Sequence, residues 1–161
     1  MWRSNLAHNR SLHADEQDVG NAPKSYLTFR VARQDLAMEA ARVRGILPLS
    51  ELVLLPGVRA GLLGIASLQG HMVAVFDLCT KLDLPNVSPG PRPKIVVLEV
   101  TSGGSQHMAG FVADRVSDVV LYRDRDLRSG SLRGKGRPRK LIDFDRLVTA
   151  DEVAGLWAFS P

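Results

Sequence analysis

Few residues of this chain have the types and the spacing that catalysis requires. The four histidines (His8, His13, His71 and His107) are scattered along the sequence and lack the short spacings of a metal site. The chain also lacks a nucleophile elbow, a Walker sequence and a dinucleotide-binding fingerprint. We therefore expect a protein without metal, cofactor or enzymatic activity.

One cysteine and three aspartates remain as candidates for chemistry. Cys79 is the only cysteine, which excludes an intrachain disulfide and is compatible with a reducing compartment. As a nucleophile Cys79 would need a base that only the fold could bring near, so a small packed residue is the simpler interpretation. Asp77, Asp143 and Asp145 follow expected strands, where aspartates usually cap turns.

The strongest local signal for a ligand is a basic segment. Residues 121–140 hold eight basic and two acidic residues, a net charge of +6, whereas the whole chain carries +4. Residues 134–140 resemble the AT-hook, a Gly-Arg-Pro core with basic flanks that lies in the minor groove of AT-rich DNA. The possible nucleic-acid or anion contacts are Lys135, which stands where the motif prefers arginine, Arg137, Arg139 and Lys140. This alternative describes a small basic β-barrel that binds nucleic acid, and the simpler interpretation is a solvated basic loop.

Length and composition limit the class of protein. A chain of 161 residues with 45% hydrophobic and 24% charged residues fits one ordinary domain or two very small ones. No apolar run approaches the roughly 20 residues of a membrane helix, and the first residues do not resemble a signal peptide. We expect a cytoplasmic protein that does not insert into membranes.

Short alternating apolar runs predict an all-β domain. Residues 1–24 are polar and aperiodic, which predicts a flexible tail. From residue 25 the sequence changes to short runs typical of β-strands. A capping box formed by Thr149 and Glu152 predicts a C-terminal helix over 149–157. Four prolines in 85–93 predict a linker or an exposed loop. The expected strands are 26–31, 36–41, 43–47, 52–55, 64–68, 72–76, 95–100, 107–112, 116–122 and 141–144, with a tight hairpin at 69–71.

A weak internal echo favours two similar halves. The Phe-Asp pair at 76–77 recurs at 144–145, each time after an expected strand. Many short strands in two halves are typical of two small barrels. The repeat is short enough to be coincidence.

From about residue 26 to residue 157 the chain resembles the CheW-like family, the coupling proteins of bacterial chemosensory arrays. Two blocks are the most specific: 63–78 is similar to the family's Gly-Val-Ile-Asn-Leu-Arg-Gly segment and its following strand, and 110–119 resembles its Val-Asp-x-Val block. The opening strand at 26–31, the Leu-Pro-Gly at 55–57 and the closing strand at 141–147 extend the match.

The resemblance implies a CheW-like domain over 25–161 with two intertwined five-stranded barrels. The expected first barrel covers about 36–90, and the second covers about 26–35 and 91–148. Family members usually have a further strand between Val119 and Leu141, where this chain has only the basic stretch. The second barrel is therefore expected to be incomplete.

The resemblance also implies a function without catalysis. Such proteins bridge the cytoplasmic tip of a chemoreceptor and the regulatory domain of a histidine kinase, and the receptor docks in an apolar groove between the barrels. For some of the matching positions, Ile95 and Val119 above all, simple core packing is the alternative. The positions that match this groove are Val43, Ile46, Gln69, Ile95, Gly110 and Val119.

Three positions depart from the family pattern. Gln69 stands where the family usually has Arg, Ser67 where it has Asn, and Gly45 where it often has Glu. In the family that Glu can pair with that Arg, so losing both avoids leaving an unpaired charge in a semi-buried site. Whether the receptor interface survives these changes is therefore open.

Overall fold

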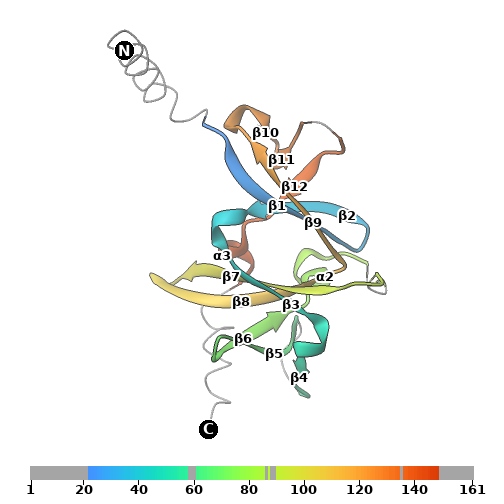
Figure 1. Cartoon of the computed structure of the whole chain (residues 1–161), viewed down its shortest axis with the longest axis vertical. Helices are drawn as coiled ribbons and strands as arrows, with labels where there is room; N and C mark the ends of the chain where they lie inside the picture. The colour runs from blue at the N-terminus through green and yellow to red at the C-terminus, as the bar shows by residue number, and fades with distance from the viewer. Residues whose placement is uncertain (1–21, 58–60, 86, 88–89, 135, 149–161) are drawn as a thin grey trace, which may run out of the picture.

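Twelve strands of the computed structural model form two six-stranded sheets (Figure 1). The structure describes residues 22–57, 61–85, 87, 90–134 and 136–148. Sheet A has the order β10-β11-β12-β2-β1-β9, and sheet B has the order β3-β7-β8-β6-β5-β4. The all-β prediction is confirmed, with six strands in each sheet instead of five.

The bounds of the elements are as follows. Sheet A contains β1 (Lys24–Val31), β2 (Gln34–Glu39), β9 (Arg115–Tyr122), β10 (Leu127–Arg128), β11 (Ser131–Leu132) and β12 (Arg139–Leu141). Sheet B contains β3 (Val43–Pro48), β4 (Val53–Leu54), β5 (Leu62–Leu68), β6 (His71–Phe76), β7 (Lys94–Ser102) and β8 (Ser105–Ala113). Short helical turns connect them: η2 (Ala40–Arg42), η3 (Leu49–Glu51), α2 (Leu78–Leu82), η4 (Asp124–Asp126) and α3 (Phe144–Leu147).

The two sheets divide the chain differently from the predicted barrel boundaries. β2 pairs with β1 and, in parallel, with β12, so it belongs to sheet A and not to the middle block. β7 and β8 pair with β3 and β6 and therefore belong to sheet B. Sheet A is thus built from both ends of the domain, and sheet B is one continuous block between them. Among the described residues, the outer strands β9 and β10 of sheet A do not pair with each other.

Three hydrophobic clusters fill the space between and beside the sheets. The main core lies between them, where the Phe111 ring packs 4.9 Å from both Phe29 of sheet A and Phe144 of α3. A second cluster covers the other face of sheet B, and a third covers the other face of sheet A. β7 therefore has both faces buried, which explains its unbroken apolar run: Val96 and Leu98 face the main core, and Ile95 faces the second cluster.

Tight turns set the register of the hairpins. The predicted hairpin at 69–71 is confirmed as a two-residue turn, in which Gln69 and Gly70 have φ of 50° and 80°. The β1–β2 turn has the same form at Ala32 and Arg33, with φ of 49° and 66°. The Asp114 carboxylate accepts a hydrogen bond from the Ala32 N–H at 2.9 Å, and this bond holds the turn against the β8–β9 junction.

Two expectations for the C-terminal half are wrong. The basic stretch is not a loop alone, because it contributes β10 and β11 and leads into β12, which binds the edge of β2. The expected strand at 141–144 ends at its first residue, since Asp143 caps the short helix α3 by accepting a hydrogen bond from the Asp145 N–H. The helix expected at 149–157 and most of the expected tail (1–21) lie outside the described residues, while Lys24 already begins β1.

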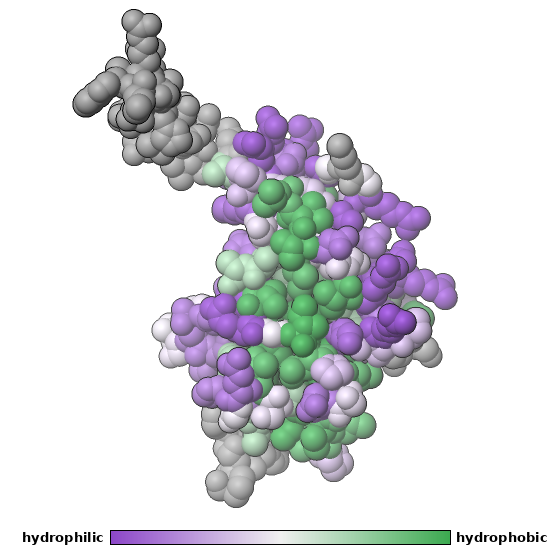
Figure 2. Space-filling view, in the orientation of Figure 1, coloured by the Kyte–Doolittle hydropathy of each residue, from purple (hydrophilic) through white to green (hydrophobic). Residues whose placement is uncertain are grey.

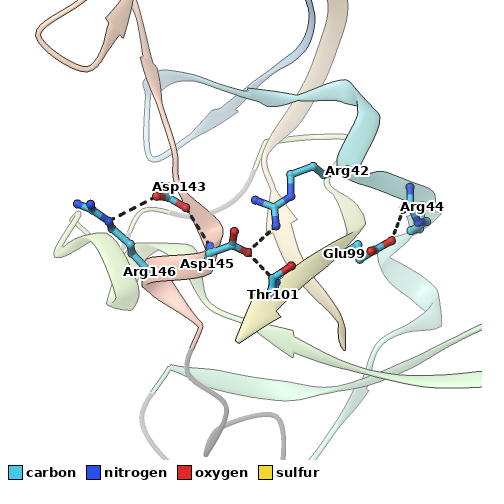
Figure 3. A network of polar contacts seen from close by, with 7 residues as sticks. All are labelled: Arg42, Arg44, Glu99, Thr101, Asp143, Asp145 and Arg146. Atoms are coloured by element: carbon cyan, nitrogen blue, oxygen red, sulfur yellow. Dashed lines mark hydrogen bonds and ion pairs between the residues drawn. The ribbon is translucent and has the colours of Figure 1, made fainter. Parts of the chain in front are cut away.

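A polar network joins the two sheets where the chain crosses between them (Figure 3). Arg42, in the η2 turn between the sheets, donates from Nη2 to Asp145 Oδ1 at 2.5 Å. The same oxygen accepts a hydrogen bond from the Thr101 N–H of β7 at 2.7 Å. The Arg42 hydrogen bond lowers the pKa of the Asp145 carboxyl below its ordinary value of 3.8, and the Thr101 N–H adds to this effect. Arg44 of β3 pairs with Glu99 of β7 within sheet B.

Candidate protein-binding surface

Exposed apolar side chains lie on the edge strands of both sheets. On β9, Val119 and Leu121 are 59% and 64% exposed, and on β3 Ile46 is 45% exposed. Figure 2 shows a band of apolar side chains down the middle of one face, from the level of β9 to the level of β4 and β5. Apolar side chains that gather on a surface indicate a site of protein contact.

A cleft of about 710 Å³ opens between the two sheets. It lies among the β1–β2 turn, β3, the proline-rich segment before β7 and the β8–β9 junction. Ile46, Val87 and Val116 supply apolar side chains, and five cations line the cleft with them. These cations are Arg30, Arg33, Arg92, Lys94 and Arg115. The cleft can therefore hold a ligand that is apolar at its centre and negatively charged at its edges.

A second apolar surface lies at the far edge of sheet B. Val53 and Leu54 of β4 are the exposed residues of the outer strand, and Met72 of β6 is exposed on the same sheet. β4 can lie close to β5 only because the opposite residue is Gly64, where an added Cβ would stand 2.0 Å from the Val53 carbonyl oxygen. Exposed apolar side chains therefore occur at both edges of sheet B, with Ile46 on β3 and with Val53 and Leu54 on β4.

The six residues predicted for a receptor groove fall into two groups. Ile46, Gln69 and Val119 are exposed, and Val43 is half-buried against the main core. Ile95 and Gly110 are buried: Ile95 belongs to the second cluster, and an added Cβ at Gly110 would meet its side chain at 3.3 Å. These two residues do not line an exposed surface, because β7 and β8, the strands that carry them, are covered on both faces.

Gly45 and Gln69, the two positions where the family can have a paired Glu and Arg, lie close together in the fold. Gly45 of β3 packs against the Leu68 side chain, where an added Cβ would stand 2.9 Å from Leu68 Cδ1. Leu68 directly precedes Gln69 in the turn after β5. A larger side chain at position 45 would require the flexible Leu68 side chain to move.

Some of the residues predicted to contact nucleic acid are engaged in contacts within the domain. Arg139 is half-buried and donates from Nη1 to the Tyr122 hydroxyl at 2.8 Å. Lys140 is exposed but its backbone is paired in the sheet between Ser131 and Leu36, whereas Arg137 is exposed in the connection between β11 and β12. Lys135 lies outside the described residues. Two of the four predicted contacts, Arg139 and Lys140, are therefore part of sheet A.

The described residues offer little for catalysis. They contain no group of three or more His, Cys, Asp or Glu side chains that could hold a metal. Burial raises the pKa of the half-buried Cys79 thiol, and the Asp77 carboxylate raises it further, so the reactive thiolate is disfavoured. Asp77 caps α2 by accepting a hydrogen bond from the Cys79 N–H, as predicted for an aspartate at a strand end.

Sequence reasoning missed most of the cleft. Its cations come from the β1–β2 turn, the segment before β7 and the start of β9, which are far apart in the sequence and share no spacing. The consecutive apolar residues at 119–121 were the one available signal for the β9 surface, because one face of a half-buried strand should be polar.

None of the helices in the described part of the chain has the length and apolar character needed to cross a membrane.

Comparison with known proteins gives one consistent result. The sequence profile of the CheW-like domain matches residues 25–146. The chain is 25% identical over 146 residues to the chemotaxis protein CheW of Rhizobium meliloti (strain 1021), an alignment that covers 82% of this chain and 92% of that protein. It is 22% identical over 103 residues to the chemotaxis protein CheW of Bacillus subtilis (strain 168), with 64% of each chain covered.

A solved structure shares the fold. The scaffolding protein TtCheW from Thermoanaerobacter tengcongensis superposes with a TM-score of 0.67 at 17% sequence identity. The match covers 78% of this chain and 92% of that chain.

Proposed function

This chain belongs to the CheW-like domain family, a family of non-catalytic adaptors, and on that premise we propose that it couples a chemoreceptor to a histidine kinase. In this role it binds the cytoplasmic tip of the receptor with one surface and the regulatory domain of the kinase with another. The state of the receptor then biases the kinase through the scaffold that lies between them.

The observation that carries this proposal is the presence of exposed apolar side chains at the two opposite edges of sheet B. One edge has Ile46 of β3, which lines the inter-sheet cleft, and Val119 is exposed on the edge strand β9 of sheet A. The opposite edge of sheet B has Leu54 of β4. A bridging protein needs two such surfaces, because both partners must bind at the same time. We assign the receptor to the cleft side and the kinase domain to the β4 side.

The assignment is tested by calorimetric titration with each partner separately. The partners are a receptor-tip hairpin and a kinase regulatory domain from the same organism. Val119→Asp is expected to weaken receptor binding only, and Leu54→Asp is expected to weaken kinase binding only. The two substitutions are a matched pair, because each adds one carboxylate to an exposed position on an edge strand.

Two results would contradict the proposal. A folded protein that binds neither partner in the micromolar range would exclude the coupling role. Binding to AT-rich duplex DNA that weakens steeply with salt, together with the loss of that binding in Arg137→Gln, would support the nucleic-acid alternative instead.

A further inference from the structure

Four of the five cations of the inter-sheet cleft lack carboxylate partners within the part of the chain that the structure describes. Arg33, Arg92, Lys94 and Arg115 form no ion pair or side-chain hydrogen bond there, and three of these side chains are exposed. A cleft that is lined by cations without neighbouring carboxylates has a positive electrostatic potential, which attracts anionic groups. A cluster of unpaired cations around one cleft therefore indicates that the negative charge comes from a ligand.

Asp114 is the only acid among the described residues that line the cleft, and it is already engaged. Asp114 accepts the Ala32 N–H with its carboxylate, and its own N–H donates to the Arg30 carbonyl at 2.8 Å. Arg30 differs from the other cations, because its Nε lies 3.4 Å from Asp35 Oδ1. That Nε is buried and makes no hydrogen bond, so Asp35 satisfies it only in part. The net charge of the lining is positive even when these two acids are counted.

We propose that this cleft binds an acidic peptide segment of a partner protein. Its carboxylates contact the cations at the rim, and one of its apolar side chains packs against Ile46, Val87 and Val116. The inference rests on the proposed function for the kind of partner, and it adds the chemistry of the segment that the partner presents.

The apolar part of the lining favours a peptide over other anions. A phosphate or another small ion would engage the arginines but would leave the apolar side chains in contact with water. Nucleic acid would require a continuous basic track along its backbone, whereas here the Asp114 carboxylate interrupts the cations. A volume of about 710 Å³ also exceeds the volume of a single small ion and can hold several side chains.

The test uses the full chain and a fluorescent peptide rich in Glu with interspersed Leu. We expect saturable binding that weakens when the salt concentration rises from about 50 to about 300 mM, because the ion pairs at the rim are exposed. The matched peptide with Gln in place of every Glu should bind at least about tenfold more weakly. Inorganic phosphate should not displace the peptide more than sodium chloride of the same ionic strength does.

Paired charge reversals locate the site. Arg92→Glu combined with Arg115→Glu should weaken peptide binding about tenfold or more, since each reversal replaces an attraction by a repulsion. Arg128→Glu combined with Arg137→Glu makes the same change of charge on exposed residues at the β10–β12 end and should change affinity less than about twofold. Thermal melting of all variants verifies folding, and Arg92→Gln combined with Arg115→Gln replaces the reversal if that variant is unfolded.

The outcomes separate this inference from the proposed function. Equal losses in the two double variants, or equal binding of the Glu and Gln peptides, would overturn the inference. If the acidic peptide fails to bind while the receptor tip binds, the chemistry proposed for the cleft is wrong and the coupling role stands. If phosphate displaces the peptide at low concentration, the site takes small anions and the peptide proposal is also overturned.

Discussion

Asp145 is expected to be one of the few surface aspartates whose loss destabilises the whole domain. Its Oδ1 atom joins η2, α3 and β7, which belong to different parts of the fold, through the Arg42 Nη2 and Thr101 N–H hydrogen bonds. A hydrogen bond to a charged group contributes about 1.5–3 kcal/mol when protected, whereas an exposed ion pair contributes about 0.2–1 kcal/mol.

The exposure of the network decides between these ranges. The Arg42 and Asp145 side chains are 27% and 35% exposed, so each bond should lie near the lower end. We expect Asp145→Ala to lower the free energy of unfolding by about 1–2 kcal/mol, which corresponds to about 3–6 °C in Tm for a chain of this size. Asp145→Asn keeps an oxygen for the Thr101 N–H but loses the charge, so it should cost about half as much.

The assay is thermal unfolding followed by circular dichroism over a range of pH. Because the folded pKa of Asp145 is lowered, its contribution is complete above the ordinary pKa of 3.8 and is lost as the pH falls through the folded value. The difference between wild type and Asp145→Ala should therefore be constant at neutral pH and shrink in acid. Asp118→Ala is the control, since the carboxylate of Asp118 has no side-chain partner in the described region and its backbone bonds to Thr28 would remain.

Two results would refute this reasoning. One is a loss of stability in Asp145→Ala no larger than that in Asp118→Ala. The other is a difference between wild type and Asp145→Ala that does not change with pH in the acid range where the carboxylate becomes protonated.

Two further predictions concern the sheet edges. Gly64→Ala should destabilise the protein by about 1–3 kcal/mol, because the new Cβ would displace the Val53 carbonyl. It should also speed amide exchange at Leu55, whose N–H donates to the Leu63 carbonyl beside β4. Unchanged exchange at Leu55 would contradict the prediction. Thr28→Val should cost about 1–3 kcal/mol, because the buried Thr28 hydroxyl donates to the Asp118 carbonyl at 2.9 Å and accepts its N–H at 3.1 Å, whereas Thr28→Ser should retain most of the stability.

The sequence alone predicted those strands whose apolar pattern and turn residues match their position in the sheets. The alternating run of β1 and the Gln-Gly turn after β5 are examples, and both lie where they were expected. The strand predicted at 141–144 shares only Leu141 with β12, because Arg139 and Lys140 have a low preference for strands. The ladder with β2 and the Arg139–Tyr122 hydrogen bond supply what the local sequence lacks.

The candidate site was harder to predict than the fold. Matching Ile95 to a family position gave no information on its burial, because β7 is covered on both faces only in the folded domain. Similarly, Arg33 and Arg115 come together only because the β1–β2 turn is tied to the β8–β9 junction by Asp114. Contacts of this kind depend on the tertiary structure and have no signature within a short window of sequence.

The division of the chain between the sheets has a consequence for its synthesis. Sheet B is continuous in sequence from Val43 to Ala113, so all its strands are synthesised before β9. The β1–β2 hairpin emerges first, yet its neighbours β9 and β12 emerge last. All the strands of sheet B that Phe29 and Leu36 pack against in the main core are thus available before the two neighbours of the hairpin in sheet A are complete.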